Sequence, residues 1–373
     1  MKKIGILGGG QLGRMLLQAA ANYPAETYVM EKEADCPAAN LCHHFRAGNI
    51  QDYDDVLAFG RSLDVITIEI EHVNVDALEQ LEREGIRVIP KPAALRILQN
   101  KILQKEFYQK HQINSAPFVI TQTRAELSDH LPFLPAVHKL AMGGYDGRGV
   151  CVLNQATDLE CGFDEPSVLE KKIDIQKEIA VLVGVNQQGE TRVYPAVEMV
   201  FDQKLNLLDY QLSPAFISDK TKEEAQALAA LAVKQLESPG LFAVEMFLGK
   251  DGVMRVNEIA PRVHNSGHHT IEAHYSSQFD MLWRILMELP LGDPAALLPS
   301  IMVNLVGAEG YTGEATYEGL DRLLQLPNVF VHLYGKKLTK PGRKMGHFTM
   351  IGADPKKLIE DAHLAKSFLQ IRS

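Results

Sequence analysis

The segment EIAPRVHNSGHH, residues 258–269, gathers an acid, an arginine, an asparagine, a serine and three histidines within twelve residues. These groups could bind a metal ion, bind a phosphate or hold one another in a structural loop. His264 and His268 have HxxxH spacing, which on a helix would put both imidazoles on one face, and His269 could complete a zinc site. Because proline, asparagine and glycine interrupt the segment, we expect a loop, and zinc is the weaker hypothesis.

Two acidic residues lie in otherwise apolar strand patterns in the same region. Glu245 is in FAVEMFL and Glu258 is in VMRVNEIA, and the intervening KDGV is typical of a hairpin turn. Folding of this hairpin is expected to bring the two carboxylates side by side. Buried carboxylates repel unless a proton or a cation lies between them, so the pair favours Mg²⁺ completed by phosphate oxygens. The alternative is that one acid pairs with Arg255 or Arg262.

A glycine-rich loop follows the first apolar run of the chain. Gly8, Gly10 and Gly13 fit GxGxxG between a predicted strand and a predicted helix. Such a loop directs backbone N–H groups toward an anion, and Glu31 lies where a dinucleotide-binding fold has its ribose-binding acid. We expect the loop to bind a phosphate without a nicotinamide; a tight strand-to-helix turn is the alternative.

A second glycine-rich loop, GGYDGRG at residues 143–149, comes shortly after Lys139. It does not fit the GxxxxGK[ST] pattern, so a P-loop is excluded. A lysine followed by a flexible glycine hairpin is nevertheless suited to cover phosphates, because glycine lets the backbone approach oxygen atoms closely. The alternative is a surface hairpin with an Asp-Gly turn.

Composition limits the class of protein. The 373 residues are 46% hydrophobic and 23% charged, as in globular enzymes of two or three domains. A formal charge of −9 argues against nucleic-acid binding. The four cysteines form no CxxC pair, which favours reduced thiols. No apolar run is long enough to cross a membrane and no signal peptide is recognised, so we expect a cytoplasmic protein.

The elements expected to position these residues change character along the chain. Strands alternate with helices over the first 90 or so residues, which predicts a parallel sheet. A helix is predicted over residues 92–110, a small α+β unit follows, and later strands alternate as in an antiparallel sheet. The predicted domains are an N-terminal α/β domain (1–98), a linker helix (99–116), a small lid (117–177) and a C-terminal α+β domain (178–373).

Four motifs then identify a family. GGGQLGRM (8–15), GGYDGRG (143–149), NEIAPRVHNSGHHTIEA (257–273) and PGRKMGH (341–347) occur in the order in which they stand in N5-carboxyaminoimidazole ribonucleotide synthetases. The sequence resembles this family almost from end to end. The resemblance implies a three-domain α/β ATP-grasp fold. It also implies ATP- and bicarbonate-dependent carboxylation of 5-aminoimidazole ribonucleotide, through carboxyphosphate, in purine biosynthesis.

The resemblance implies a nucleotide site between the lid and the third domain. Glu245 and Glu258 match its Mg²⁺ ligands, and Glu178 matches its ribose contact. Lys101 departs from the arginine that the family often has, and Val150 from a frequent glutamine. The matching nucleotide-binding residues are Lys101, Lys139, Gly144, Tyr145, Asp146, Gly147, Arg148, Gly149, Val150, Glu170, Lys171, Lys172, Ile173, Glu178, Asn257 and Glu258.

The resemblance also implies a ribonucleotide site and a homodimer. The matching substrate-binding residues are Gln11, Leu12, Glu69, His264, Asn265, Ser266, Gly267, Lys336, Arg343 and Lys344. The residues expected to act in the reaction are Arg262, His268, Asp146, Tyr145 and Lys336. The expected partners are small-molecule substrates, with neither nucleic acid nor membrane.

Three other functions compete with this one. A nicotinamide oxidoreductase would use the first glycine loop. An ATP-grasp homologue without activity would act as a binding subunit, although Lys139, Glu245 and Glu258 are all present. A sister ATP-grasp ligase would transfer formyl phosphate to glycinamide ribonucleotide, but that family lacks the HNSGH and GRKMGH motifs together.

Overall fold

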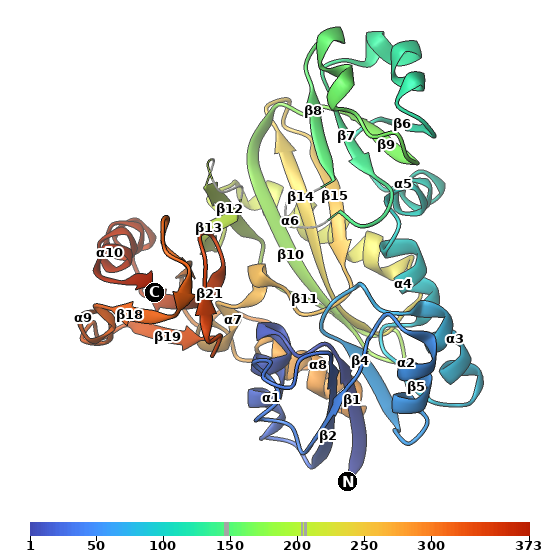
Figure 1. Ribbon diagram of the computed structural model, residues 1–373. Coiled ribbons are helices and arrows are strands. Elements are labelled where there is room, and N and C mark those ends of the chain that lie inside the picture. The colour runs from blue at the N-terminus through green and yellow to red at the C-terminus, as the bar shows by residue number, and fades with distance from the viewer. Residues whose placement is uncertain (145–148, 203, 205–206) are drawn as a thin grey trace.

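The computed structural model describes residues 1–144, 149–202, 204 and 207–373. In Figure 1 the amino-terminal part (blue) lies at the bottom, a small sheet (green and cyan) at the top, and the carboxyl-terminal strands (red) at the left. Long strands of a large sheet run between these parts. None of the described helices is both long enough and apolar enough to cross a lipid bilayer.

The amino-terminal domain is built on a five-stranded parallel sheet of order β3-β2-β1-β4-β5, which confirms the expected parallel sheet. Strand β4 and the last four residues of β1 are buried, as expected for strands covered on both faces. The strands are β1 (Lys2–Leu7), β2 (Ala25–Glu31), β3 (His44–Ala47), β4 (Val65–Ile68) and β5 (Arg87–Val88). The helices are α1 (Gln11–Ala20), α2 (Tyr53–Gly60) and α3 (Val75–Arg83).

The helix predicted over residues 92–110 is two helices, α4 (Pro92–Leu98) and α5 (Lys101–Lys110). Asn100 causes the break, because its side-chain oxygen accepts the N–H groups of Ile102 and Leu103 and so caps the second helix. The single-helix prediction was therefore wrong. The cap places Lys101 in the first turn of α5.

The lid is a four-stranded antiparallel sheet of order β6-β9-β7-β8. Two 3₁₀ segments, η1 and η2, pack on it around Leu127 and Leu159. The elements are β6 (Phe118–Thr121), η1 (Ala125–Phe133), β7 (Ala136–Leu140), β8 (Val150–Leu153), η2 (Ala156–Cys161) and β9 (Ser167–Lys171).

The third domain contains a nine-stranded antiparallel sheet of order β15-β14-β10-β12-β13-β16-β21-β19, with β11 paired to β10. This confirms the antiparallel sheet expected after residue 178. The strands are β10 (Ile175–Val185), β11 (Thr191–Val193), β12 (Val197–Asp202), β13 (Leu207–Ser213), β14 (Gly240–Gly249), β15 (Met254–Ala260), β16 (Ser300–Val306), β19 (Val329–Leu333) and β21 (Lys344–Ile351).

Helices and two small two-stranded sheets complete this domain. The helical segments are α6 (Asp219–Lys234), η3 (Asn265–Gly267), α7 (Thr270–Ala273), α8 (Gln278–Met287), α9 (Leu320–Leu324) and α10 (Pro355–Phe368). The small sheets pair β17 (Gly313–Glu314) with β20 (Leu338–Thr339), and β18 (Thr316–Glu318) with β22 (Gln370–Arg372).

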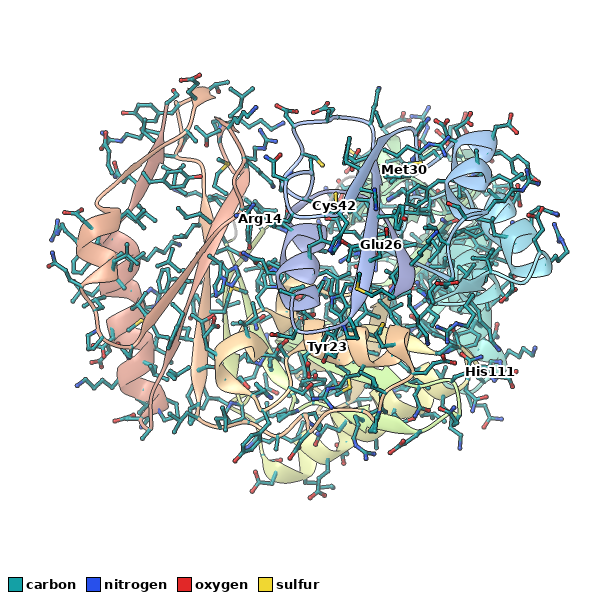
Figure 2. The ribbon with its side chains drawn as sticks, turned by 90° about the horizontal axis from the view of Figure 1, so that it is seen from below. Arg14, Tyr23, Glu26, Met30, Cys42 and His111 are labelled. Atoms are coloured by element: carbon teal, nitrogen blue, oxygen red, sulfur yellow. The ribbon has the colours of Figure 1, made fainter. Side chains whose placement is uncertain are left out.

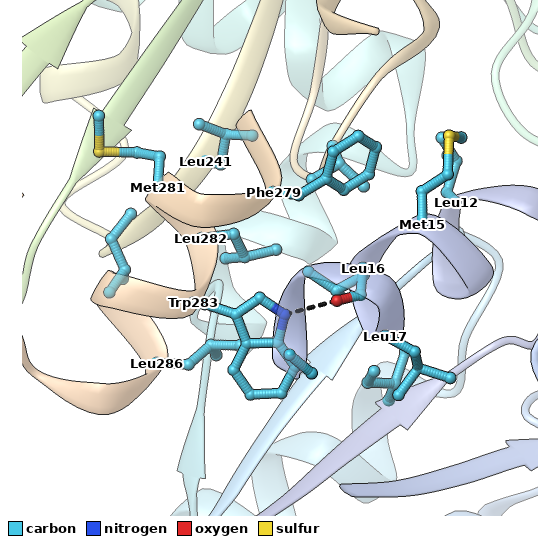
Figure 3. Close-up of a cluster of buried hydrophobic side chains, with 14 of the residues drawn as sticks. Leu12, Met15, Leu16, Leu17, Leu241, Phe279, Met281, Leu282, Trp283 and Leu286 are labelled. Atoms are coloured by element: carbon cyan, nitrogen blue, oxygen red, sulfur yellow. Dashed lines mark hydrogen bonds between the residues drawn. The ribbon is translucent and has the colours of Figure 1, made fainter. Parts of the chain in front are cut away.

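One apolar core joins the first domain to the third. Helices α1 and α8 pack against each other around Trp283, whose side chain is 0% exposed. Its indole Nε1–H donates to the backbone oxygen of Leu16 at 2.6 Å, as Figure 3 shows. Since the donor and the acceptor come from different domains, this contact fixes how the first domain sits against the large sheet.

We predict that Trp283→Ala destabilises the protein by about 3–5 kcal/mol, because it removes a large buried ring and leaves a cavity between α1 and α8. Urea unfolding followed by far-ultraviolet circular dichroism measures the loss, since the variant has no tryptophan fluorescence. Tyr275→Ala is the matched control, because Tyr275 is 69% exposed. A loss below about 1 kcal/mol for Trp283→Ala would contradict this account of the joint.

Candidate active site

The two acids predicted to be neighbours are register partners in the β14–β15 hairpin. The expected side-by-side placement of Glu245 and Glu258 is therefore confirmed. Burial and the adjacent Glu258 carboxylate raise the pKa of Glu245. The ammonium of Lys101 lowers the pKa of Glu258, which remains the charged member of the pair.

Two lysines from different elements reach this hairpin. Lys101, at the start of α5, lies 2.7 Å from Glu258 Oε2. Burial by itself would lower the pKa of Lys101, but Glu258 outweighs burial and the pKa is raised. Lys139, on lid strand β7, donates to Asn257 Oδ1 at 3.0 Å and to Glu170 Oε2 at 3.2 Å. The lid and the third domain thus meet through charged side chains at one place.

Lys105 is a buried cation that the sequence analysis missed. Its side chain is 2% exposed, and its Nζ donates to Ser115 Oγ at 3.2 Å and to the Ala116 oxygen at 3.1 Å. Glu170 Oε1 lies 3.7 Å away. Burial lowers the pKa of Lys105 to about 8. Lys105 follows Lys101 by four residues in the predicted helix. This spacing places both side chains on one face of the helix and was the sequence signal for Lys105.

The donor set at the hairpin suits a hard divalent cation. The two carboxylates lie side by side with the Lys101 ammonium next to Glu258, and Mg²⁺ in proteins commonly uses one or two carboxylates together with substrate phosphates. Zinc has less support. Within the described ranges, no group of three or more His, Cys, Asp or Glu side chains is arranged to hold a metal.

The HNSGH motif is a loop, as predicted, with a short 3₁₀ turn. Gln278 on α8 holds it from both sides: Gln278 Oε1 accepts the N–H of His264 at 2.8 Å, and its Nε2 donates to the His264 oxygen at 2.8 Å. The His264 imidazole also contacts Ser266, while its Nε2 lies 3.3 Å from Glu245 Oε1. The loop therefore presents His264 to the acid pair. Sequence spacing contained no signal for Gln278.

Arg262 connects this loop to the first domain. Its Nε lies 2.9 Å from Glu71 Oε1, just after β4. Burial would lower the pKa of Arg262, but the Glu71 carboxylate keeps it raised. Arg262 thus did not pair with the neighbouring Glu258 as one alternative supposed. The acidic run EIEH after β4 was the sequence signal for Glu71.

The donors of the first glycine loop are already used by the protein. Glu31 Oε2 accepts the N–H of Gly9 at 3.0 Å, while Glu69 accepts those of Gly10 at 2.9 Å and Leu12 at 3.3 Å. Burial raises the pKa of Glu69. The carboxylates occupy the position that a phosphate would need, so the expected phosphate site receives no support. For the same reason, the loop gives no support to a site for the phosphates of a nicotinamide dinucleotide.

The basic residues Lys336, Arg343 and Lys344 belong to the segment that runs from the end of β19 to the start of β21. This segment lies near helix α1 of the first domain. Lys336 Nζ donates to the Lys344 backbone oxygen at 2.8 Å, and Arg343 Nη1 donates to the Leu338 oxygen at 2.8 Å. A Cβ added at Gly335 would stand 3.4 Å from Nη1 of Arg14 on α1. Figure 2 shows Arg14 between α1 and the carboxyl-terminal strands. The residues predicted for the ribonucleotide phosphate therefore approach α1, which begins at Gln11.

Several predicted residues lie elsewhere or have other partners. Lys171 donates to the Phe133 and Leu134 oxygens, and Lys172 to Asn154, so both side chains serve the lid itself. His268 is 1% exposed, and its ring stacks on that of His347. Burial raises the pKa of Glu178 to about 7. Tyr145, Asp146, Gly147 and Arg148 lie outside the described residues.

Comparisons with known proteins cover most of the chain. Family models match a ribonucleotide synthetase preATP-grasp domain at residues 1–99, an ATP-grasp domain at 106–279 and a phosphoribosylaminoimidazole carboxylase C-terminal domain at 300–361. The chloroplastic phosphoribosylaminoimidazole carboxylase of Vigna aconitifolia is 39% identical over 94% of this chain. The chain spans 64% of the length of that relative.

Solved structures agree with these matches. The N5-carboxyaminoimidazole ribonucleotide synthetase of Thermotoga maritima is 38% identical, with a TM-score of 0.93 and all of both chains covered. The N5-carboxyaminoimidazole synthase of Aspergillus clavatus, solved with ADP and 5-aminoimidazole ribonucleotide, is 34% identical, with a TM-score of 0.88 and 98% of both chains covered. The fold is the ATP-grasp fold, and the chain belongs to the N5-carboxyaminoimidazole ribonucleotide synthetase family of ATP-grasp enzymes.

Proposed function

We propose that the chain carboxylates 5-aminoimidazole ribonucleotide to N5-carboxyaminoimidazole ribonucleotide, using ATP and bicarbonate. The observation that supports this most is a convergence of three groups. Lys101 lies 2.7 Å from Glu258, and Lys139 donates to the adjacent Asn257 at 3.0 Å and to Glu170 at 3.2 Å. His264, in the loop that follows Arg262, contacts Glu245. The Aspergillus clavatus relative was solved with the corresponding ribonucleotide and ADP.

The reaction needs these groups together because bicarbonate is a poor electrophile. A bicarbonate oxygen attacks the γ-phosphorus of ATP, the bond to the bridging oxygen breaks, and ADP leaves as carboxyphosphate forms. Negative charge on the phosphoryl oxygens must be neutralised during transfer. Lys101 and Lys139 are the cations placed to do this. Glu245 and Glu258 would hold Mg²⁺, which would supply further positive charge during the transfer.

The second step joins carbon to nitrogen. The exocyclic amine of the ribonucleotide attacks the carboxyl carbon, phosphate leaves, and the amine loses a proton. The Arg262 guanidinium is suited to hold the carboxyl oxygens because of its planar fork. The proton-transfer role expected of His268 fits His264 better, because His264 Nε2 contacts Glu245 while His268 is buried. Burial lowers the pKa of His264 to about 3, so its imidazole is neutral at pH 7.

The decisive experiment measures ADP release with ATP, Mg²⁺, bicarbonate and 5-aminoimidazole ribonucleotide, omitting one component at a time. Release that needs the ribonucleotide and rises with bicarbonate supports the proposal. Release with formate and glycinamide ribonucleotide instead would assign the chain to the sister reaction. Absence of release in both mixtures would favour the binding-subunit hypothesis.

A homodimer, which the resemblance implies, and a cytoplasmic location, which the composition favours, remain predictions. We expect sedimentation to give about twice the 41.4 kDa mass of one chain. A single species at the mass of one chain over the micromolar range would contradict the dimer.

We predict that Glu258→Gln lowers turnover by more than tenfold while the fold is retained, because the amide cannot replace a charged metal ligand. Steady-state ADP release measures this effect, and Mn²⁺ binding followed by electron paramagnetic resonance checks the metal directly. Asp251→Asn is the control, since this exposed acid on the same hairpin pairs with Arg255. Turnover above about a tenth of the original, a barrier change below about 1.4 kcal/mol, would remove Glu258 from the metal site.

We predict that Arg343→Ala raises the KM for the ribonucleotide with little change in kcat, because a contact to a non-reacting phosphate contributes mainly to binding. Initial rates at varied ribonucleotide and varied ATP measure the two KM values. Lys340→Ala removes a positive charge from the same exposed turn and serves as the control. An increase confined to the KM for ATP would show that the phosphate pocket is placed wrongly.

A further inference from the structure

Three imidazole rings lie stacked beneath the proposed site. The ring centroids of His268 and His347 are 4.7 Å apart with 28° between the planes. Those of His347 and His332 are 4.6 Å apart with 13° between the planes. We call these three residues the imidazole stack. The carboxylation chemistry described above uses neither His347 nor His332.

The stack forms because three separate elements meet there. His332 and His347 are register partners on β19 and β21, so their side chains project from the same face of the sheet. His268 comes from the HNSGH loop, which packs over that face. Both His268 and His347 are buried, with 1% and 0% of their surface exposed. The stack is therefore an internal contact between the loop and the sheet.

Each ring is held by a polar side chain. Gln278 Nε2 donates toward His268 Nδ1 at 3.1 Å, which assigns the proton of that imidazole to Nε2. The Tyr334 hydroxyl lies 3.0 Å from His347 Nδ1, and Glu272 Oε1 lies 2.6 Å from His332 Nε2. The rings are thereby fixed in orientation as well as in spacing.

The rings of His268 and His347 are neutral. Burial lowers the pKa of His268 and of His347 well below the ordinary value, and the neighbouring imidazoles lower both further. The positive groups near His268 are Lys344 and Arg262, and the acid at the far end of the stack is Glu272. Neutral rings can pack face to face without the repulsion that charged rings would bring.

The stack stands at the joint between the two halves of the proposed site. The loop on one side carries Arg262 and His264, which face the acids. Strand β21 on the other side begins at Lys344, next to Arg343, and contains His347 three residues later. A change in the spacing of the rings would therefore change the distance between the HNSGH loop and strand β21.

We propose that His268, His347 and His332 are positioning residues that set the spacing between the Arg262–His264 loop and the strand that binds the ribonucleotide phosphate. The role in binding rests on the proposed function. The structural part does not, because it concerns only how the loop and β21 hold each other.

The test begins with His347→Ala, which removes the middle ring. The KM for 5-aminoimidazole ribonucleotide is expected to rise about tenfold while the KM for ATP changes less than about twofold, because only the loop-to-strand spacing is altered. The double variant His347→Phe with Tyr334→Phe keeps a stacked ring and removes both partners of one hydrogen bond, so it is expected to restore the KM. His363→Ala, an exposed histidine on α10, is the control.

A second readout separates this proposal from the proposed function. Hydrogen–deuterium exchange of His347→Ala is expected to increase in both residues 264–269 and residues 344–351, whether or not the enzyme turns over. If His347→Ala does not fold, Glu272→Gln loosens the His332 end and is expected to show a smaller change in the same direction. Wild-type protein without turnover would overturn the proposed function alone. Unchanged exchange in the loop, or equal changes in both KM values, would overturn the positioning role.

Discussion

Two carboxylates on facing positions of a hairpin impose an electrostatic constraint on how the domains meet. Glu245 and Glu258 are register partners, and two adjacent, partly buried carboxylates repel each other unless a proton or a cation lies between them. Lys101 from α5 and Lys139 from the lid supply positive charge here. Because the acids and the cations come from different parts of the chain, the domains must meet where the charges balance.

Apolar packing and an ion pair fix the first domain in place next to these charged residues. The α1–α8 core around Trp283 fixes the first domain against the large sheet. Arg262 reaches Glu71 across the same joint at 2.9 Å. The proposed reaction forms a water-sensitive intermediate that must stay next to its acceptor, and a rigid joint between the domains serves that need.

The local elements were largely predictable, and the misses have physical causes. Alternating strands and helices indicated the parallel sheet, and the acids of the β14–β15 hairpin indicated its register. Good helix formers on both sides of Asn100 predict one helix over residues 92–110, but the capping side chain of Asn100 divides it into two. The first glycine loop fitted an anion-binding pattern, yet its anions are the protein's own Glu31 and Glu69.

Motifs in a fixed order along the chain are enough to identify the family, and a short hairpin is enough to predict that Glu245 and Glu258 are adjacent. The partners that join distant parts of the chain depend on how the elements pack. Lys105 beside Glu170, Gln278 around His264, and the stacked rings of His268 and His347 join segments that are distant in sequence. Such pairs arise when whole elements pack, and no local periodicity encodes them, because the same side chains could have met other neighbours until the domains docked.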